Sequence, residues 1–113
     1  MARGAVYESM DNSQKALENY TQASEIDPEN FLPHYRIGLI HKQDKNYKQC
    51  IIDFGNVIKI NDQVADAFYE RALAYAYLGN NDDKDKVIRD FQAAAKLGHS
   101  GAQDVLKSIN VQW

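Results

Sequence analysis

Three residues in the middle of the chain have side chains that can bind a metal ion or act as nucleophiles: His34, His41 and Cys50. Imidazole nitrogens and thiolates are common zinc ligands, and a cysteine beside a histidine can attack a carbonyl carbon. The two histidines lie seven residues apart, however, which on a helix is about two turns and too far to share one ion. All three also occupy positions of a repeating packing pattern, so we interpret them as core residues. Burial there would raise the pKa of the Cys50 thiol and make it unreactive.

The other polar signals also favour structural roles. The acidic run Asp82–Asp85 lacks the glycine and the final glutamate of a calcium loop, and suits a solvated helix N-terminus. His99 follows the expected end of a helix, where its protonated ring would interact favourably with the helix dipole. No glycine-rich phosphate loop or serine–histidine–aspartate motif occurs in the sequence. We therefore predict that the protein is not an enzyme and has no catalytic residue, metal site or cofactor.

The bulk composition is that of one soluble globular domain. The chain has 113 residues, of which 44% are hydrophobic and 26% charged, with a net charge of −3. An acidic balance argues against binding to nucleic acid or to an anionic membrane surface. One cysteine excludes an internal disulfide, and no apolar run reaches the length of a membrane span. Since Met1–Tyr7 lacks the apolar core of a signal peptide, we expect a cytoplasmic protein, unless the N-terminus was trimmed from a longer chain.

A period of 34 residues organises the sequence. Three sets of residues are in register at this spacing: Gly4, Gly38 and Ala72; Tyr7, His41 and Tyr75; and Tyr20 with Phe54. Self-similarity at a fixed period indicates a stack of repeated structural units. From Phe54 to Phe91 the spacing is 37 residues, which places an insertion of three residues in the turn around 79–85 or at the start of the helix that follows.

Apolar spacing and turn residues predict seven helices, over residues 2–10, 14–27, 32–43, 47–60, 65–78, 83–97 and 100–110. The first turn is predicted at Asp11-Asn12-Ser13, because these residues are favoured in turns and as helix N-caps. Pro28 must end the second helix, since proline cannot continue it. Ser100 is the expected N-cap of the last helix, which would cover the end of the stack.

These spacings resemble the tetratricopeptide repeat (TPR), a helix–turn–helix unit of 34 residues. The matching residues are Gly4, Tyr7, Ala16, Tyr20, Ala23 and Pro28 in the first repeat, Ile37, Gly38, Phe54 and Val57 in the second, and Ala72, Tyr75, Phe91 and Ala94 in the third. The stretch from Ala95 to Gln103 is similar to the ending of bacterial TPR and Sel1-like chains. The resemblance implies a single all-α domain over 1–113, a right-handed superhelix of about three repeats (1–30, 31–64 and 65–98) and a capping helix within 99–113.

The resemblance also implies a concave face, lined by the first helix of each repeat, that binds a peptide. The predicted partner-binding groove contains Tyr35, Arg36, Leu39, Lys42, Tyr69, Glu70, Leu73 and Tyr77. An alternative for its four aromatic and leucine residues at 35, 39, 69 and 73 is that they pack between adjacent helices. The cations Arg36 and Lys42 face Asp66 and Glu70, which indicates either a ligand of mixed charge or an ion pair across the groove.

We predict a non-catalytic scaffold that binds a peptide or helix of another protein. TPR domains that hold the C-terminal carboxylate of large chaperones use cationic and amide side chains, whereas this chain has two acids, Asp66 and Glu70, among the matching positions. They would repel a carboxylate, so we exclude that subclass. We expect a monomer. The alternative is a self-assembly module that stacks repeats between chains through its N-terminal edge, because a short first helix would leave apolar surface near Val6.

Overall fold

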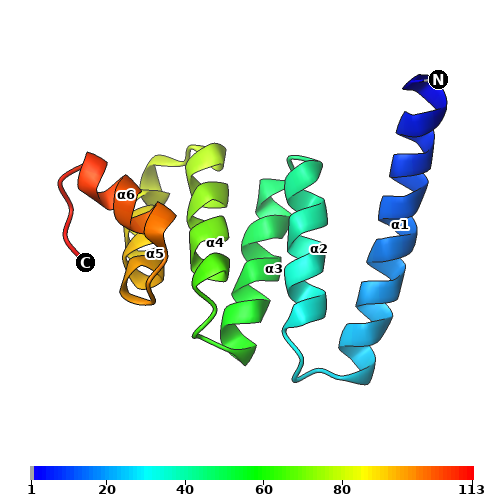
Figure 1. Ribbon diagram of the computed structural model, residues 1–113, viewed down its shortest axis with the longest axis horizontal. Coiled ribbons are helices and arrows are strands. Elements are labelled where there is room, and N and C mark those ends of the chain that lie inside the picture. Colours follow the sequence, from blue (N-terminus) through cyan, green and yellow to red (C-terminus); the bar gives the residue numbers. More distant parts are fainter. Residues whose placement is uncertain (1) are drawn as a thin grey trace.

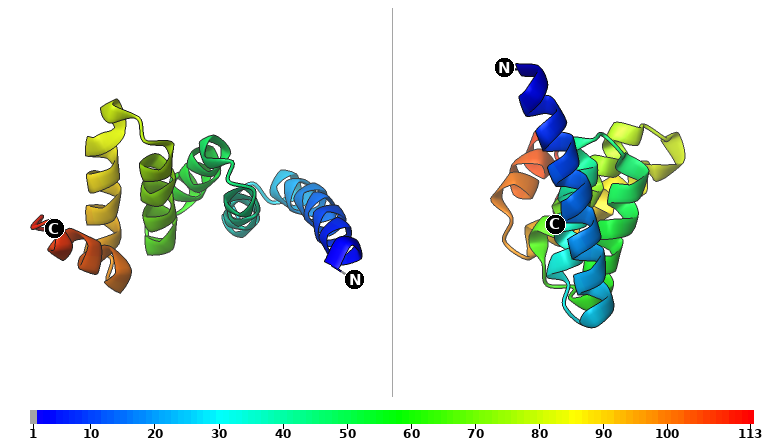
Figure 2. Two further views of the ribbon diagram at one scale, coloured as in Figure 1. Left: turned by 90° about the horizontal axis from the view of Figure 1, so that it is seen from above. Right: turned by 90° about the vertical axis from the view of Figure 1, so that its right-hand side faces the viewer.

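The computed structural model describes residues 2–113, with side chains from Ser13 onward. This part of the chain consists of six α-helices and one short 3-10 helix, without strands: α1 (Ala2–Ile26), α2 (Leu32–Gln43), α3 (Tyr47–Ile60), α4 (Ala65–Leu78), η1 (Asn81–Asp83), α5 (Lys84–Lys96) and α6 (Ser100–Ser108). The helices α1 to α5 stand side by side in the order of the sequence, and α6 packs against α5 at the far end (Figure 1). Seen from above, they form a curved row, the shape of an all-α repeat superhelix (Figure 2).

Three of the predicted helices begin and end at the predicted residues, namely α2, α3 and α4. Pro33 lies in the first turn of α2, where its missing N–H costs nothing. The inserted residues between α4 and α5 lie in the turn, since η1 occupies it and α5 begins at Lys84. The last helix, α6, ends at Ser108, two residues earlier than predicted.

The predicted turn at Asp11-Asn12-Ser13 is wrong, because α1 is one continuous helix of 25 residues. None of these three residues is glycine or proline, and each costs less than about 0.7 kcal/mol in a helix interior. The turns that do reverse the chain contain a left-handed residue, Lys45 with φ 58° and Gly79 with φ 70°. Only the later boundary was placed correctly, since α1 ends at Ile26, just before Pro28. The first repeat is therefore one long helix.

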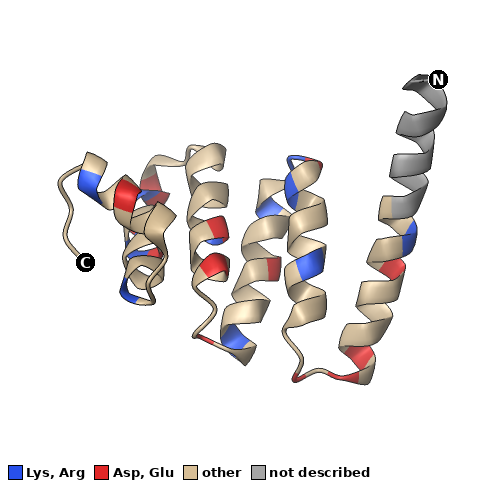
Figure 3. Cartoon of the chain, viewed as in Figure 1, with Lys and Arg blue, Asp and Glu red and all other residues tan. Residues whose placement is uncertain are grey.

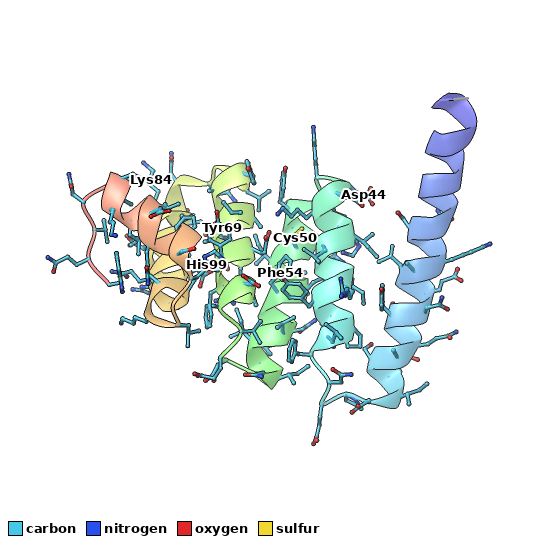
Figure 4. All side chains as sticks on the ribbon, viewed as in Figure 1. Asp44, Cys50, Phe54, Tyr69, Lys84 and His99 are labelled. Atoms are coloured by element: carbon cyan, nitrogen blue, oxygen red, sulfur yellow. The ribbon has the colours of Figure 1, made fainter. Side chains whose placement is uncertain are left out.

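The core has two apolar clusters, one for each complete helix–turn–helix. Phe54 and Val57 of α3 are fully buried against α2 and α4 in the first cluster. The ring of Phe54 lies against Gly38, where an added Cβ would be 2.8 Å from the ring Cζ (Figure 4). Phe91 takes the equivalent place in the second cluster, beside Ala72. The same aromatic residue thus closes each of these repeats, as the period of the sequence predicts.

Two buried carboxylates tie the paired helices together. Asp53 and Asp90 each precede the aromatic core residue of their repeat, and are 6% and 5% exposed. His41 Nδ1 lies 2.6 Å from Asp53 Oδ2, and Arg71 makes two hydrogen bonds of 2.8 Å to Asp90. Each pair joins the first helix of a repeat to its second. The repeats thus share the carboxylate position but use different cationic partners.

Candidate partner-binding groove

The first helices of the second and third repeats, α2 and α4, share one face of the molecule. Lys42 Nζ on α2 lies 2.7 Å from Glu70 Oε2 on α4. The hydrogen bond to Glu70 raises the pKa of Lys42, although partial burial opposes the shift. Of the two alternatives left open by the sequence, the ion pair across the groove is the one the structure contains for these two residues.

On α2, Tyr35 and Leu39 pack into the core cluster around Phe54. The rings of Tyr35 and Phe54 meet edge to face, with centroids 5.6 Å apart. Burial, and then the charges of Asp66 and Glu70, raise the pKa of the Tyr35 hydroxyl. The packing alternative therefore describes both side chains, which shape the groove from below.

On α4, Tyr69 is covered by the start of the capping helix (Figure 4). Its ring stacks on His99 with centroids 4.2 Å apart and meets Phe91 edge to face at 5.7 Å. His99 Nε2 lies 3.0 Å from Asp66 Oδ1. With Leu73 packed against the same cluster, the third-repeat end of the predicted groove is occupied by the chain itself.

His99, and not the predicted Ser100, is the N-cap of α6. Its Nδ1 accepts a hydrogen bond of 3.0 Å from the backbone N–H of Ala102. Since Nδ1 accepts, Nε2 carries the proton and donates to Asp66. The preceding helix ends without this histidine, because Gly98 has φ 95° and the N–H groups of Gly98 and His99 bond back to the carbonyls of Ala95 and Ala94. The predicted dipole role of His99 at that helix end is therefore replaced by a cap on the next helix.

An exposed pair of tyrosines lies between α3 and α4. Tyr77, near the end of α4, stacks on Tyr47 at the start of α3, with ring centroids 5.0 Å apart. Tyr77 is 62% exposed, and Lys42 and Leu73 line the same shallow depression. Tyr47 was not among the predicted groove residues. Its position in the first turn of a helix gives no sign, in sequence alone, that it meets an aromatic residue thirty positions later.

A larger hollow of about 570 Å³ lies between α1 and α2. It is lined by Ala16, Tyr20, Arg36, Leu39, Ile40, Lys42 and Gln43. Three predicted groove residues thus meet here with two from α1 that the sequence assigned to core packing. Their repeat register, with Ala16 equivalent to Cys50 and Tyr20 to Phe54, is the signal that marks them as facing a helix of their own repeat.

The charges of the groove are mostly paired. Figure 3 shows acidic positions on α4 and basic positions on α2. Glu70 is paired with Lys42 and Asp66 with His99. Arg36 is exposed and, among the side chains that the structure describes, has no carboxylate within ion-pair distance. The groove therefore presents one cation that is not already neutralised by these acids.

The candidate chemical residues lie inside the repeats. Cys50 is 1% exposed and its Sγ lies 3.5 Å from the carbonyl oxygen of Gly38. Burial raises the pKa of its thiol to about 11, which confirms the predicted unreactive environment. His41 is engaged by Asp53. Within the residues described, no group of three or more histidine, cysteine or acidic side chains is arranged to hold a metal ion. No described helix is long and apolar enough to cross a lipid bilayer.

Comparison with known families decides the nature of the repeats. One TPR repeat model matches residues 4–45, and a second tetratricopeptide repeat model matches 33–64. The chain contains tetratricopeptide repeats. A comparison with curated proteins found no match. Neither TPR model reaches residues 95–103, so the Sel1-like ending stays a prediction.

Among solved structures, the TPR fold of this chain is similar to the first TPR of Spaghetti (RPAP3) bound to the HSP90 peptide SRMEEVD. The TM-score is 0.76 at 18% sequence identity, and the match covers 96% of this chain and 86% of that chain. The likeness shows that both chains share one helical repeat architecture. It extends over nearly the whole TPR array described here, including the third repeat that the two family models leave unmatched.

Proposed function

We propose that this chain is a non-catalytic scaffold that binds a peptide or helix of a partner protein on the face shared by α2 and α4. The observation that supports it best is an exposed stack of two tyrosines, Tyr47 and Tyr77, beside the cation Lys42. Exposed tyrosines offer a large contact area with a hydrogen-bonding tip, and are enriched where proteins bind one another. TPR repeats are typically interaction modules, and the repeats place these residues on one face.

The predicted groove residues divide into two groups in this proposal. Arg36, Lys42 and Tyr77 are accessible and contact the ligand directly. The other members support them, since they pack on the core or pair with a neighbour: Tyr35, Leu39, Tyr69, Glu70 and Leu73. Because the capping helix covers the third-repeat end, the ligand lies towards α2. This division explains why only part of the predicted set is available for contact.

The charges favour a ligand with an acidic residue next to an apolar one. The acid would meet Arg36, and the apolar side chain would lie on the tyrosine pair. A C-terminal carboxylate is disfavoured, because Asp66 and Glu70 stand where a carboxylate clamp needs cations. The Spaghetti domain binds a chaperone peptide, and this chain departs from such a mode at these two acids.

A selection from a displayed peptide library, followed by titration of the enriched peptide, tests this proposal. Arg36→Glu should weaken binding at least tenfold, whereas Lys59→Glu, a charge reversal on the exposed side of α3, should not. Tyr77→Ser should weaken it similarly. Its matched control is Ile52→Ser, which removes another large exposed side chain, 56% accessible, from α3. Equal affinity for all four variants, with circular dichroism showing intact helices, would place the binding surface elsewhere.

A further inference from the structure

The first repeat lacks a contact that the other two repeats make. In the second repeat Phe54 packs on Gly38, and in the third Phe91 packs beside Ala72. The register equivalents in the first repeat are Tyr20 and Gly4. Both belong to α1, where 16 residues separate them by about 24 Å along the helix axis. A continuous α1 therefore cannot bring its own glycine to its own tyrosine.

The hollow between α1 and α2 marks where the absent first helix would lie. Its α1 side is formed by Ala16 and Tyr20, the equivalents of Cys50 and Phe54. The later pair is 1% and 0% exposed, because α2 covers it. Ala16 and Tyr20 are only partly buried, and about 570 Å³ in front of them is open. A helix that presents a glycine at the right height would complete the site.

We propose that a second copy of this chain supplies that helix, by reciprocal antiparallel packing of two α1 helices. Residues 2–10 of each copy would fill the hollow of the other. The register follows from the second repeat: Gly38 meets Phe54, so 34 residues earlier Gly4 of one copy meets Tyr20 of its partner. The two-fold axis then passes near residue 12, and every contact occurs twice, as in an isologous interface.

The chain itself indicates this occupant. The TPR model that matches residues 4–45 begins at Gly4, so the signature of the absent helix is present in the sequence although α1 does not fold back. A straight helix that carries both halves of a helical hairpin is suited to exchange with an identical helix. Exchange would also place a third helix beside α2, and the concave face would be complete only in the dimer. This inference goes beyond the proposed function and does not depend on any peptide ligand.

Chemical cross-linking of mixed chains tests the exchange directly. His41 and Asp53, which are in contact, have Tyr7 and Asn19 as register equivalents. Tyr7→Cys and Asn19→Cys are introduced into separate chains, each with Cys50→Ala, and the two are refolded together. A short bismaleimide should join them into a covalent dimer. Neither variant alone should do so, because the model separates residues 7 and 7 by about 15 Å along the axis, and 19 and 19 by about 21 Å.

A second arm asks whether the continuous helix is the cause. Ser13 is the equivalent of Tyr47, the first residue of α3, so Ser13→Pro fits a helix that starts there but interrupts α1. In sedimentation equilibrium the unmodified chain should be a dimer and Ser13→Pro a monomer of similar helicity.

Three results would overturn the exchange. They are no cross-link in the mixture, a strictly monomeric unmodified chain, or a cross-link within a single chain carrying both cysteines. Each can occur whether or not the peptide selection succeeds, so the two proposals fail separately.

Discussion

The contact between Gly38 and Phe54 makes a sharp prediction about stability. A Cβ added at Gly38 would lie 2.8, 2.9 and 3.1 Å from three atoms of the Phe54 ring. That ring is fully buried, and Tyr35 packs against it edge to face. The ring therefore has little room to move away, and Gly38→Ala should force the helices α2 and α3 apart or strain the side chain. The third repeat has Ala72 at the equivalent position, so its two helices already accommodate a Cβ there.

Two opposing effects set the size of the change. Overpacking a well-filled core costs about 1–3 kcal/mol. Replacing a mid-helix glycine by alanine returns roughly 0.5–1 kcal/mol. The crowding wins because the contacted atoms are buried, and the net loss should be about 0.5–2 kcal/mol. For a domain of this size that lowers the melting temperature by roughly 2–8 °C.

Gly55 provides the matched control, because it is also a glycine inside a helix. A Cβ there would have only an Arg71 guanidinium nitrogen nearby, at 3.7 Å, an ordinary contact. Gly55→Ala should therefore stabilise the protein by about 0.5–1 kcal/mol. Urea unfolding followed by circular dichroism measures both variants. If Gly38→Ala were as stable as Gly55→Ala, the close fit of Phe54 against α2 would be refuted.

Three further predictions concern buried polar groups. Arg71→Met should cost about 2–4 kcal/mol in urea unfolding, because it leaves the Asp90 carboxylate buried without its cation; a loss below about 0.5 kcal/mol would contradict this. Burial raises the pKa of Asp53, against the opposing hydrogen bond to His41. The folded state then holds the proton more tightly, so the stability contribution of this residue should fall as pH rises from about 4 through that raised value. Asp53→Asn should lack this fall when unfolding is measured between pH 3.5 and 6. Cys50 should not react with Ellman's reagent at pH 8 until the protein is unfolded, and rapid modification of the native protein would show that the site opens.

The sequence predicted the middle of the molecule best, for identifiable reasons. Pro28 and Pro33 fix the boundary between α1 and α2, and the apolar period then places three successive helices to the residue. The 34-residue register also predicted the aromatic contacts of Phe54 and Phe91 correctly. Local chemistry and repeat geometry agree in this region, so that each supports the other.

The prediction failed where one weak local signal was opposed by a long-range effect. The turn at residues 11–13 was inferred from side chains that favour turns without requiring one, and the helix continues through them. His99 became a cap because Gly98 turns the chain and Tyr69 and Asp66 receive the imidazole, which are contacts across about thirty residues. The accessible part of the groove depended on the same capping helix, so the sequence named the right face but too large a site.

The two ends of the stack differ in a way that links the groove to assembly. At the C-terminal end, Leu106 of α6 is fully buried and His99 fastens the capping helix to α4. At the other end, Ile26 is 84% exposed and Leu32 46%, and the hollow beside Tyr20 is open. A repeat stack needs a cover at each end, because every repeat buries its apolar face only against a neighbour. The chain provides one cover itself, and a matching helix from a second copy would supply the other.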